Sequence, residues 1–323
     1  MRDGRDNHIK DVNARYHDVA AGEYDVKWGI NYEERGRSQV VGKLRKALAQ
    51  EAPSFVRSLE IGAGTGYFSL NLLRAGVIER AVATDISQGM LDELSASAER
   101  LGLSVETACC EADSLPFDDD SFDLVLGHAV LHHLPDLESA FAEFRRVLRP
   151  GGTVVFCGEP SRYGNRLAEG PKRVAIAVAP LWRRAMRVAK REGVGDERPA
   201  VEHALEFSVD VHAFVPADLE RPLRRAGFDS VRVSGEELAS SWFGWLNRTL
   251  ESTAEPLQLP LSWYQYAYRG YLILQRLDRA VLEPRLPATL FYNLLLSARA
   301  PAGASVNGDR PLAVAQPAAV AAR

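Results

Sequence analysis

The residues of this chain best suited to chemistry are residues 60–66, Glu-Ile-Gly-Ala-Gly-Thr-Gly, which follow a short apolar stretch. Glycine has no side chain, so a turn built on Gly62, Gly64 and Gly66 can bend sharply and approach a ligand closely. Glu60 places a carboxylate where the pyrophosphate of a dinucleotide would sit, and it would repel one. The pattern therefore favours a nucleoside that carries a positive charge. A strand-to-helix turn without a ligand is the alternative.

Acidic residues also end the next two predicted strands. Asp85 follows the apolar residues 81–84, and Asp113 follows a predicted strand at about 103–109. An acid at the end of the second strand of a βαβ unit is placed to accept hydrogen bonds from ribose hydroxyls. Ligands of such sheets bind beyond the carboxyl ends of the strands, so we expect Glu60, Asp85 and Asp113 to surround one ligand there.

The order of these motifs points to a known family. After Asp113 a turn feeds a fourth strand, histidines follow at positions 128, 132 and 133, and residues 148–152, Leu-Arg-Pro-Gly-Gly, lead into a fifth strand at 153–157. The ordered set resembles the class I S-adenosylmethionine-dependent methyltransferases, in particular the ubiquinone and menaquinone methylases of the type 11 branch. The resemblance covers about residues 38–158 and returns near Phe214.

The resemblance implies that the cofactor is S-adenosyl-L-methionine, and it assigns the contacts. Glu60 and the glycine turn would contact the methionine portion, and Asp85 would take the ribose hydroxyls. An N-terminal helix would close over the cofactor with an aromatic side chain, for which Tyr24 and Tyr16 are candidates by position. The implied set is Glu60, Gly62, Gly64, Gly66, Asp85, Ile86 on the adenine, Ala112 and Asp113 at the adenine edge, and Tyr24. The alternative is that Asp85 and Asp113 only cap helices or turns.

His132 and His133 follow the fourth predicted strand, beside the expected position of the transferred methyl group. A histidine there can act as a general base for a hydroxyl acceptor, because its pKa suits neutral pH. The alternative is that these imidazoles cap a helix or pack against the cofactor. We therefore name His133 and His132 as candidate catalytic residues, and we predict no metal ligands.

Strand and helix patterns alternate along the chain. The alternation predicts an α/β fold, a Rossmann-like, mostly parallel seven-stranded sheet with helices on both faces. Val40, Leu44 and Leu48 share one face of a helix before the first strand, and Ser87 is placed to cap another helix. The sixth strand is expected near 230–233 and the seventh at 290–298.

We predict an N-terminal cofactor-covering segment over residues 1–37, a methyltransferase domain over 38–301 and a disordered tail over 302–323. Two helical lid insertions, at about 161–212 and 235–287, decorate the domain. Such insertions typically build an acceptor pocket. Filling of the surface without a catalytic purpose is the alternative.

The two insertions differ in composition. Residues 160–191 hold nine basic residues and one acidic residue, Glu169, among apolar ones. This mixture suits a helix that lies on an anionic membrane through residues 172–191, with Trp182 at the interface. Pro180 is expected to interrupt that helix, and a lid packed on the core gives the same pattern. The second insertion is rich in Trp and Tyr, which favours contact with an apolar acceptor or a separate helical core.

Composition narrows the class of protein. The formal net charge of −4 argues against a nucleic-acid partner. The three cysteines, Cys109, Cys110 and Cys157, are expected in or beside buried strands, and no disulfide framework is predicted. The sequence contains neither a secretory signal nor an apolar run long enough to span a membrane. These features favour the cytoplasm, with peripheral contact at the inner membrane surface as a further expectation.

The sequence thus predicts an S-adenosylmethionine-dependent methyltransferase that acts on oxygen or carbon of a small acceptor, lipid-like or otherwise apolar. It contains no Asn/Asp-Pro-Pro-Tyr motif after the fourth strand, which argues against amino methylation of nucleobases or protein glutamine. A non-catalytic protein that binds the cofactor and a membrane-surface assembly protein are the alternatives.

Overall fold

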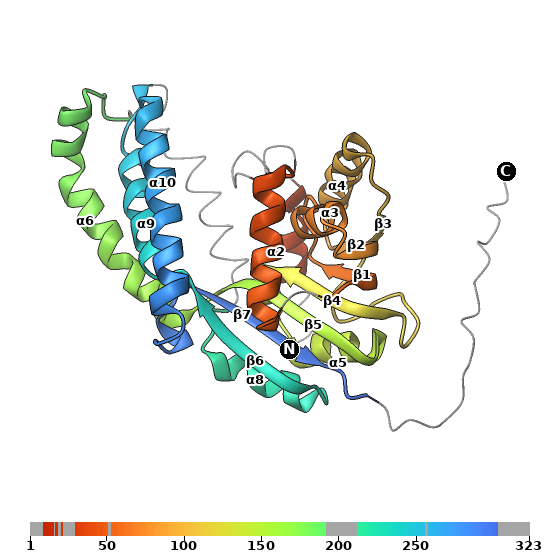
Figure 1. The fold of residues 1–323 in the computed structure, drawn as a ribbon. Coiled ribbons are helices and arrows are strands. Elements are labelled where there is room, and N and C mark those ends of the chain that lie inside the picture. Colours follow the sequence, from red (N-terminus) through yellow and green to blue (C-terminus); the bar gives the residue numbers. More distant parts are fainter. Residues whose placement is uncertain are drawn as a thin grey trace.

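A seven-stranded sheet forms the centre of the protein, with strand order β3-β2-β1-β4-β5-β7-β6 (Figure 1). The computed structural model describes residues 9–15, 17–18, 21, 30–50, 53–191, 212–255 and 258–302. β7 runs antiparallel to both of its neighbours, and the other strand pairs are parallel. The strands are β1 (Phe55–Ile61), β2 (Ile78–Asp85), β3 (Glu106–Cys109), β4 (Phe122–His128), β5 (Leu148–Pro160), β6 (Asp229–Glu236) and β7 (Asn293–Arg299). The predicted Rossmann-like, mostly parallel α/β fold is confirmed.

Helices cover both faces of the sheet (Figure 1). On one face α2 (Glu34–Leu48) buries Val40 and Leu44 in a cluster with Phe68 of α3 (Tyr67–Arg74). α4 (Gln88–Leu101) begins after Ser87, whose hydroxyl accepts a hydrogen bond from the backbone N–H of Met90 at 3.1 Å. On the other face Phe141 and Phe144 of α5 (Leu137–Val147) share a buried cluster with α8 (Pro216–Arg225). The helical spacings in the sequence therefore identify the core-facing sides correctly.

Several strands differ in extent from the prediction. The third, expected at about 103–109, begins only at Glu106. The fifth strand, expected at 153–157, continues to Pro160 because Glu159 and Pro160 pair with the start of β7. The seventh strand, expected from position 290, begins at Asn293, since the preceding residues form the short helix η4 (Ala288–Leu290). The longer β5 carries Glu159 to the carboxyl edge of the sheet.

The two insertions supply helices that pack together beside the sheet. α6 (Arg162–Met186), α9 (Ala239–Ser252) and α10 (Leu261–Leu277) stand next to one another at one side of the molecule (Figure 1), and we call them the three-helix arm. Ala175 and Ala179 of α6 are buried with Leu250 of α9. The short helix η3 (Asp278–Leu282) continues from α10.

The expectation that Pro180 interrupts the first insertion is wrong, because α6 runs unbroken through Pro171 and Pro180. Each proline removes one backbone hydrogen bond, to the carbonyl four residues earlier. Those carbonyls belong to Leu167 and Ile176, which are exposed, so water can satisfy them. Trp182, expected at a membrane interface, instead packs edge to face against Trp263 of α10, with ring centroids 5.0 Å apart.

The termini are only partly described. Of the predicted tail at 302–323 only Ala302 lies within the described residues, and residues 1–8 lie outside them.

A buried charge cluster ties α2 to the last strands of the sheet. The carboxylate of Glu236 in β6 is fully buried and pairs with the ammonium groups of Lys43 and Lys46, the latter at 3.0 Å. Burial alone would raise the pKa of Glu236, but the two ammonium groups outweigh it and hold this pKa at about 2. Lys46 also reaches Glu283, beyond η3, at 2.9 Å. The cluster therefore joins α2, β6 and the segment that follows the arm.

We predict that Glu236→Gln lowers the free energy of unfolding by about 3 kcal/mol at pH 7, because it removes the buried carboxylate that Lys43 and Lys46 share. Among the described residues, Lys43 would keep only Glu237, at 4.0 Å, and Lys46 would keep Glu283. The lowered pKa makes the wild-type contribution complete above the ordinary pKa of 4.5, and this contribution is lost as pH falls toward 2. Urea denaturation at pH 7 and pH 3 measures both effects.

The matched control is Glu34→Gln, which removes an exposed ion pair with Arg37. It should change stability by about 0.5 kcal/mol or less. Equal losses in the two variants would contradict the role given to Glu236.

Candidate functional site

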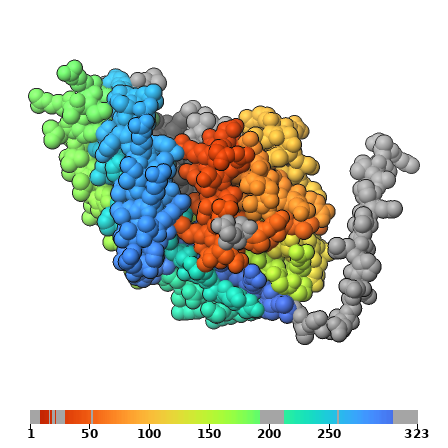
Figure 2. Space-filling view, in the orientation of Figure 1, coloured from red at the N-terminus to blue at the C-terminus, as the bar shows by residue number. Residues whose placement is uncertain are grey.

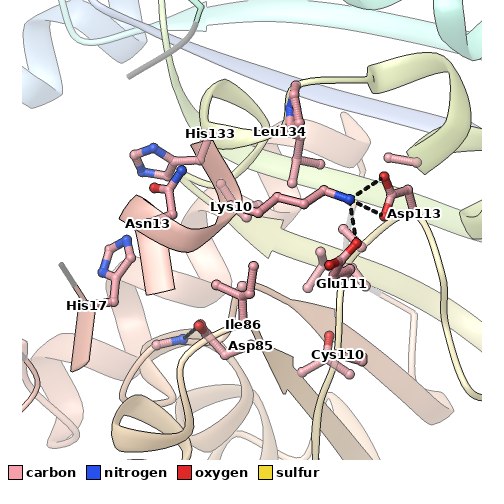
Figure 3. Close-up of a pocket in the computed structure, with 18 of the residues that line it drawn as sticks. Lys10, Asn13, His17, Asp85, Ile86, Cys110, Glu111, Asp113, His133 and Leu134 are labelled. Atoms are coloured by element: carbon pink, nitrogen blue, oxygen red, sulfur yellow. Dashed lines mark hydrogen bonds and ion pairs between the residues drawn. The ribbon is translucent and has the colours of Figure 1, made fainter. Parts of the chain in front are cut away.

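A cavity of about 910 Å³, measured to its open mouth, lies at the carboxyl ends of β1, β2 and β4 (Figure 3). Of the predicted site residues, Gly62, Gly64, Asp85, Ile86, Ala112, Asp113 and His133 line it. The strand ends thus bring most of the predicted set together at one edge of the sheet.

The glycine turn needs glycine at each position, for different reasons. Gly62, Gly64 and Gly66 have φ angles of +59°, +51° and +90°, a region that residues with a side chain rarely adopt. A Cβ atom at Gly62 would lie 2.3 Å from Cγ2 of Val130, whereas one at Gly64 would meet open space. Gly66 does not line the cavity, and a Cβ atom there would lie 2.8 Å from Leu94. Gly64 therefore gives a ligand access to the backbone, and Gly66 allows helix packing.

Asp85 holds this turn in place. One of its carboxylate oxygens accepts a hydrogen bond from the N–H of Gly64 at 2.8 Å, and the other accepts one from the N–H of Ser87 at 2.9 Å. Burial raises the pKa of Asp85, and these hydrogen bonds and the charge of His17 oppose the rise. The carboxylate thus links the ends of β1 and β2 while it faces the cavity.

Glu60 lies behind the turn and is not among the residues that line the cavity. Its buried carboxylate accepts hydrogen bonds from the N–H of Ser69, at 2.9 Å, and from the Ser69 hydroxyl, in the first turns of α3. Burial raises the pKa of Glu60 to about 7, and the nearby charge of Asp85 adds to the rise. In this geometry Glu60 bonds to the start of α3 and does not reach the cavity directly.

The region around Asp113 contains a residue that the sequence did not reveal. The ammonium group of Lys10 lies 2.9 Å from one carboxylate oxygen of Asp113 and 3.1 Å from the other, and it also pairs with Glu111 (Figure 3). Ala112 and Cys110 line the same wall. A ligand that bonds to Asp113 must therefore share this carboxylate with Lys10.

Residues near the N-terminus cover the cavity. Residues 9–15 are helical, and Lys10, Asn13 and His17 point into the cavity (Figure 3). Asp18 fastens the segment to the start of α4, because it accepts hydrogen bonds from the Ser87 hydroxyl at 2.5 Å and from the N–H of Gly89 at 3.1 Å. The candidates Tyr16 and Tyr24 lie outside the described residues. Among the described residues of this segment, polar side chains supply the contacts with the cavity.

The three histidines after β4 have distinct surroundings. His128 and His133 line the cavity, whereas His132 is not among its lining residues. Burial and the charge of Lys43 lower the pKa of His128 to about 3, so this imidazole is neutral. His133 stands at 4.0 Å, ring centroid to ring centroid, from His132 and at 5.7 Å from His17. His133 therefore faces the cavity, and His132 lies behind His133.

Glu159 fixes the turn that carries these histidines, a role that no sequence pattern predicted. Its fully buried carboxylate accepts hydrogen bonds from the N–H groups of Val130, Leu131 and His132, at 3.0, 3.0 and 3.2 Å. It also bonds to Nδ1 of His132 at 2.9 Å. Only the extension of β5 beyond the predicted strand brings this acid under the turn.

The cavity fits a nucleoside with a cationic tail. Gly64 offers open backbone, Asp85 and Asp113 offer carboxylates, and Ile86 offers an apolar surface. Asn13 adds a buried side-chain oxygen with no hydrogen-bond partner among the described residues, which a ligand donor can satisfy. Across the described residues, no group of three or more His, Cys, Asp or Glu is arranged to hold a metal ion.

Several proteins that resemble this chain in sequence are methyltransferases by name. The profile of the family described as "Methyltransferase domain" matches residues 59–156. A malonyl-[acyl-carrier protein] O-methyltransferase of Methylococcus capsulatus is 38% identical over 191 residues, which cover 58% of this chain and 56% of the relative. A demethylmenaquinone methyltransferase of Clavibacter sepedonicus is 40% identical over 103 residues, which cover 31% of this chain and 40% of the relative. The chain spans about half the length of the curated relatives that it matches.

Solved structures share the fold across nearly the whole chain. Phosphoethanolamine N-methyltransferase 2 of Haemonchus contortus matches 91% of this chain and 60% of its own, with a TM-score of 0.56 and 16% identity. The [4+2]-cyclase SpnF matches 90% of this chain and 96% of its own, with a TM-score of 0.53 and 20% identity. A methyltransferase and a cyclase thus share this architecture, so the fold alone does not define the reaction.

We predict that Glu159→Ala lowers the free energy of unfolding by about 3 kcal/mol, because three buried N–H groups lose their acceptor. His132→Ala removes one of the four hydrogen bonds and should cost less. Urea denaturation of both variants measures the difference. Stability of Glu159→Ala equal to that of the wild type would show that the carboxylate does not hold the turn.

Proposed function

We propose that the chain is an S-adenosylmethionine-dependent methyltransferase that transfers a methyl group to oxygen or carbon of a small, apolar acceptor, because residues 59–156 match a family of methyltransferase domains. When bound, S-adenosylmethionine supplies an electrophilic methyl group on a positively charged sulfur. The protein's task is then to bind, align and exclude water, and alignment alone can contribute several kcal/mol to the reaction. The observation that carries the proposal is the cavity where Gly64, Asp85 and Asp113 converge.

Each cavity residue has a role in the proposed complex. The open backbone at Gly62 and Gly64 receives the methionine portion, with the field of Glu60 behind it. Asp85 accepts hydrogen bonds from the ribose hydroxyls while it keeps its bond to the N–H of Gly64. Ile86 covers the adenine ring, and Ala112 and Asp113 bind its edge. The buried acids favour a cation, which is the charge type that this cofactor carries.

The acceptor would enter on the histidine side of the cavity. His133 is the proposed general base for a hydroxyl acceptor, and the turn held by Glu159 keeps its imidazole at the cavity wall. His132 is a positioning residue in this scheme, since its Nδ1 is engaged by Glu159. The neutral His128 completes the wall without adding a positive charge that would repel the cofactor.

An apolar acceptor is supported by two relatives that act on apolar or acyl-carrying molecules by name, a demethylmenaquinone methyltransferase and a malonyl-[acyl-carrier protein] O-methyltransferase. Apolar acceptors partition into membranes. We therefore extend the proposal to a cytoplasmic protein whose residues 172–191 make peripheral contact with the inner surface of the membrane. No helix within the described residues has the length and apolar character needed to cross a membrane.

Incubation of the full chain with cell extract and methyl-labelled S-adenosylmethionine, followed by mass spectrometry, tests the proposal. One labelled product, extractable into organic solvent and absent without the protein, is expected. Cofactor binding without any labelled product would instead support a non-catalytic binding protein.

We predict that Asp85→Asn weakens cofactor binding by at least about tenfold, because a charge-assisted hydrogen bond to the ribose is lost. Calorimetric titration with S-adenosylmethionine measures this loss. Asp92→Asn is the matched control, since Asp92 lies on the exposed side of α4 and bonds only to Gln88 within the described residues. An unchanged affinity in Asp85→Asn would exclude the ribose contact.

We predict that His133→Ala lowers turnover at saturating acceptor by about 100-fold, the usual contribution of a general base. Its cofactor affinity should stay within about twofold of the wild type, because the imidazole acts on the acceptor side. Initial rates measured across pH and a parallel cofactor titration separate the two effects. Undiminished turnover would remove His133 from catalysis.

A further inference from the structure

The exposed apolar side chains of this protein are concentrated in the three-helix arm. Within the described residues, every large apolar side chain recorded as exposed, except Val56, lies in α6, α9, α10 or η3. The arm forms one side of the molecule (Figure 2), and none of its described residues is among those that line the cavity. Exposed apolar groups that gather in one region of a surface indicate an interaction site, so we expect the surface of the arm to bind a partner.

Helix α6 carries these side chains in one stripe. Tyr163, Leu167, Val174, Val178 and Leu181 follow one another at intervals of four, seven, four and three residues, which place them on one face of a helix. Leu181 is 73% exposed and Val174 is 53% exposed. The stripe is about 27 Å long at the helical rise of 1.5 Å per residue. It is separate from the face of Ala168, Ala175 and Ala179, which is buried.

A row of arginines flanks the stripe. Arg166 directly precedes Leu167, Arg173 directly precedes Val174, and Arg184 follows Leu181 by one helical turn; all three are exposed. The helix holds six basic residues and one acidic residue, while the whole chain has a formal net charge of −4. Helix α6 therefore carries an excess of positive charge in a chain whose formal net charge is negative. Apolar side chains beside basic ones suit a helix that lies in the interface of an anionic bilayer.

We propose that α6 docks the protein on an anionic phospholipid bilayer through this stripe and its flanking arginines. A second copy of the chain fits less well, because a symmetric pairing of the stripes would bring like-charged arginine rows together. A nucleic acid would leave the apolar stripe exposed to water. The purpose of this docking rests on the proposed function. Binding to the bilayer would bring the enzyme to the phase that holds an apolar acceptor.

Sedimentation of the full chain with phospholipid vesicles tests the proposal without any methyl transfer. The wild type should bind vesicles of equal parts phosphatidylglycerol and phosphatidylcholine at low salt, and it should bind phosphatidylcholine vesicles much more weakly. Added salt should weaken binding, because surface charges are screened. Failure to bind the anionic vesicles would overturn the proposal.

Two point variants on the same helix provide a matched pair. Val178→Glu places a charge in the stripe, whereas Ile176→Glu places one on the opposite side of α6, at a residue that is 61% exposed. Both positions are exposed, so both variants should fold, and circular dichroism verifies this. Vesicle affinity should fall by about tenfold or more in Val178→Glu, and Ile176→Glu should retain more of it. Equal losses would overturn the assignment to the stripe.

The arginine row is tested by Arg173→Glu with Arg184→Glu. Each basic residue near an anionic surface contributes roughly fivefold to binding, so the double reversal should cost well over about twentyfold. Concentration-dependent self-association that Val178→Glu abolishes, without vesicle binding by the wild type, would assign the stripe to a second copy instead. Cofactor titration of each variant separates a failure of this surface from a failure of the cofactor site, which lies elsewhere in the fold.

Discussion

Buried carboxylates that accept hydrogen bonds from backbone N–H groups determine the geometry of the site. Asp85 holds the N–H of Gly64 and of Ser87, Glu60 holds the N–H of Ser69, and Glu159 holds three consecutive N–H groups after β4. Each acid lies at or near the carboxyl end of a strand, and each bonds to a loop that leaves a neighbouring strand or a helix that begins beside it. Charge-assisted hydrogen bonds therefore fix the loops of the site, together with the apolar packing of Val130 and Leu131.

The same arrangement concentrates negative charge at one edge of the sheet. Burial raises the pKa of both Glu60 and Asp85, and their mutual repulsion contributes to the rise at Glu60. A cation in the cavity would relieve this cost, because it favours the ionised form of both acids. In the described structure Lys10 supplies a positive charge to Glu111 and Asp113 at the other end of the cavity. A cationic ligand would thus neutralise the negative charge of Glu60 and Asp85, as Lys10 does for Glu111 and Asp113.

Sequence reasoning succeeded where a residue's role is set by its immediate neighbours in the chain. The place of Asp85 at a strand end predicts its position at the cavity. The place of Ser87 before a helix predicts that it caps α4. Sequence reasoning failed where the role of a residue depends on contacts between segments that are distant in the chain. Lys10 meets Asp113 across more than a hundred residues, and Glu159 reaches the histidine turn only because pairing with β7 lengthens β5. Pro180 shows the reverse error, since a local helix-breaking rule was overridden by packing on α9.

Helix α2 connects the cofactor side of the fold to the arm. Arg35 of α2 lies 3.6 Å above the ring of Tyr268 in α10, and Lys43 of α2 reaches Glu236 at the end of β6. The neighbouring Glu237 accepts a hydrogen bond from the hydroxyl of Tyr271 at 2.6 Å, again in α10. The charge of Lys43 also acts on His128 at the cavity wall. A displacement of α10 would therefore change the contacts of α2, the helix that carries Lys43, whose charge acts on His128.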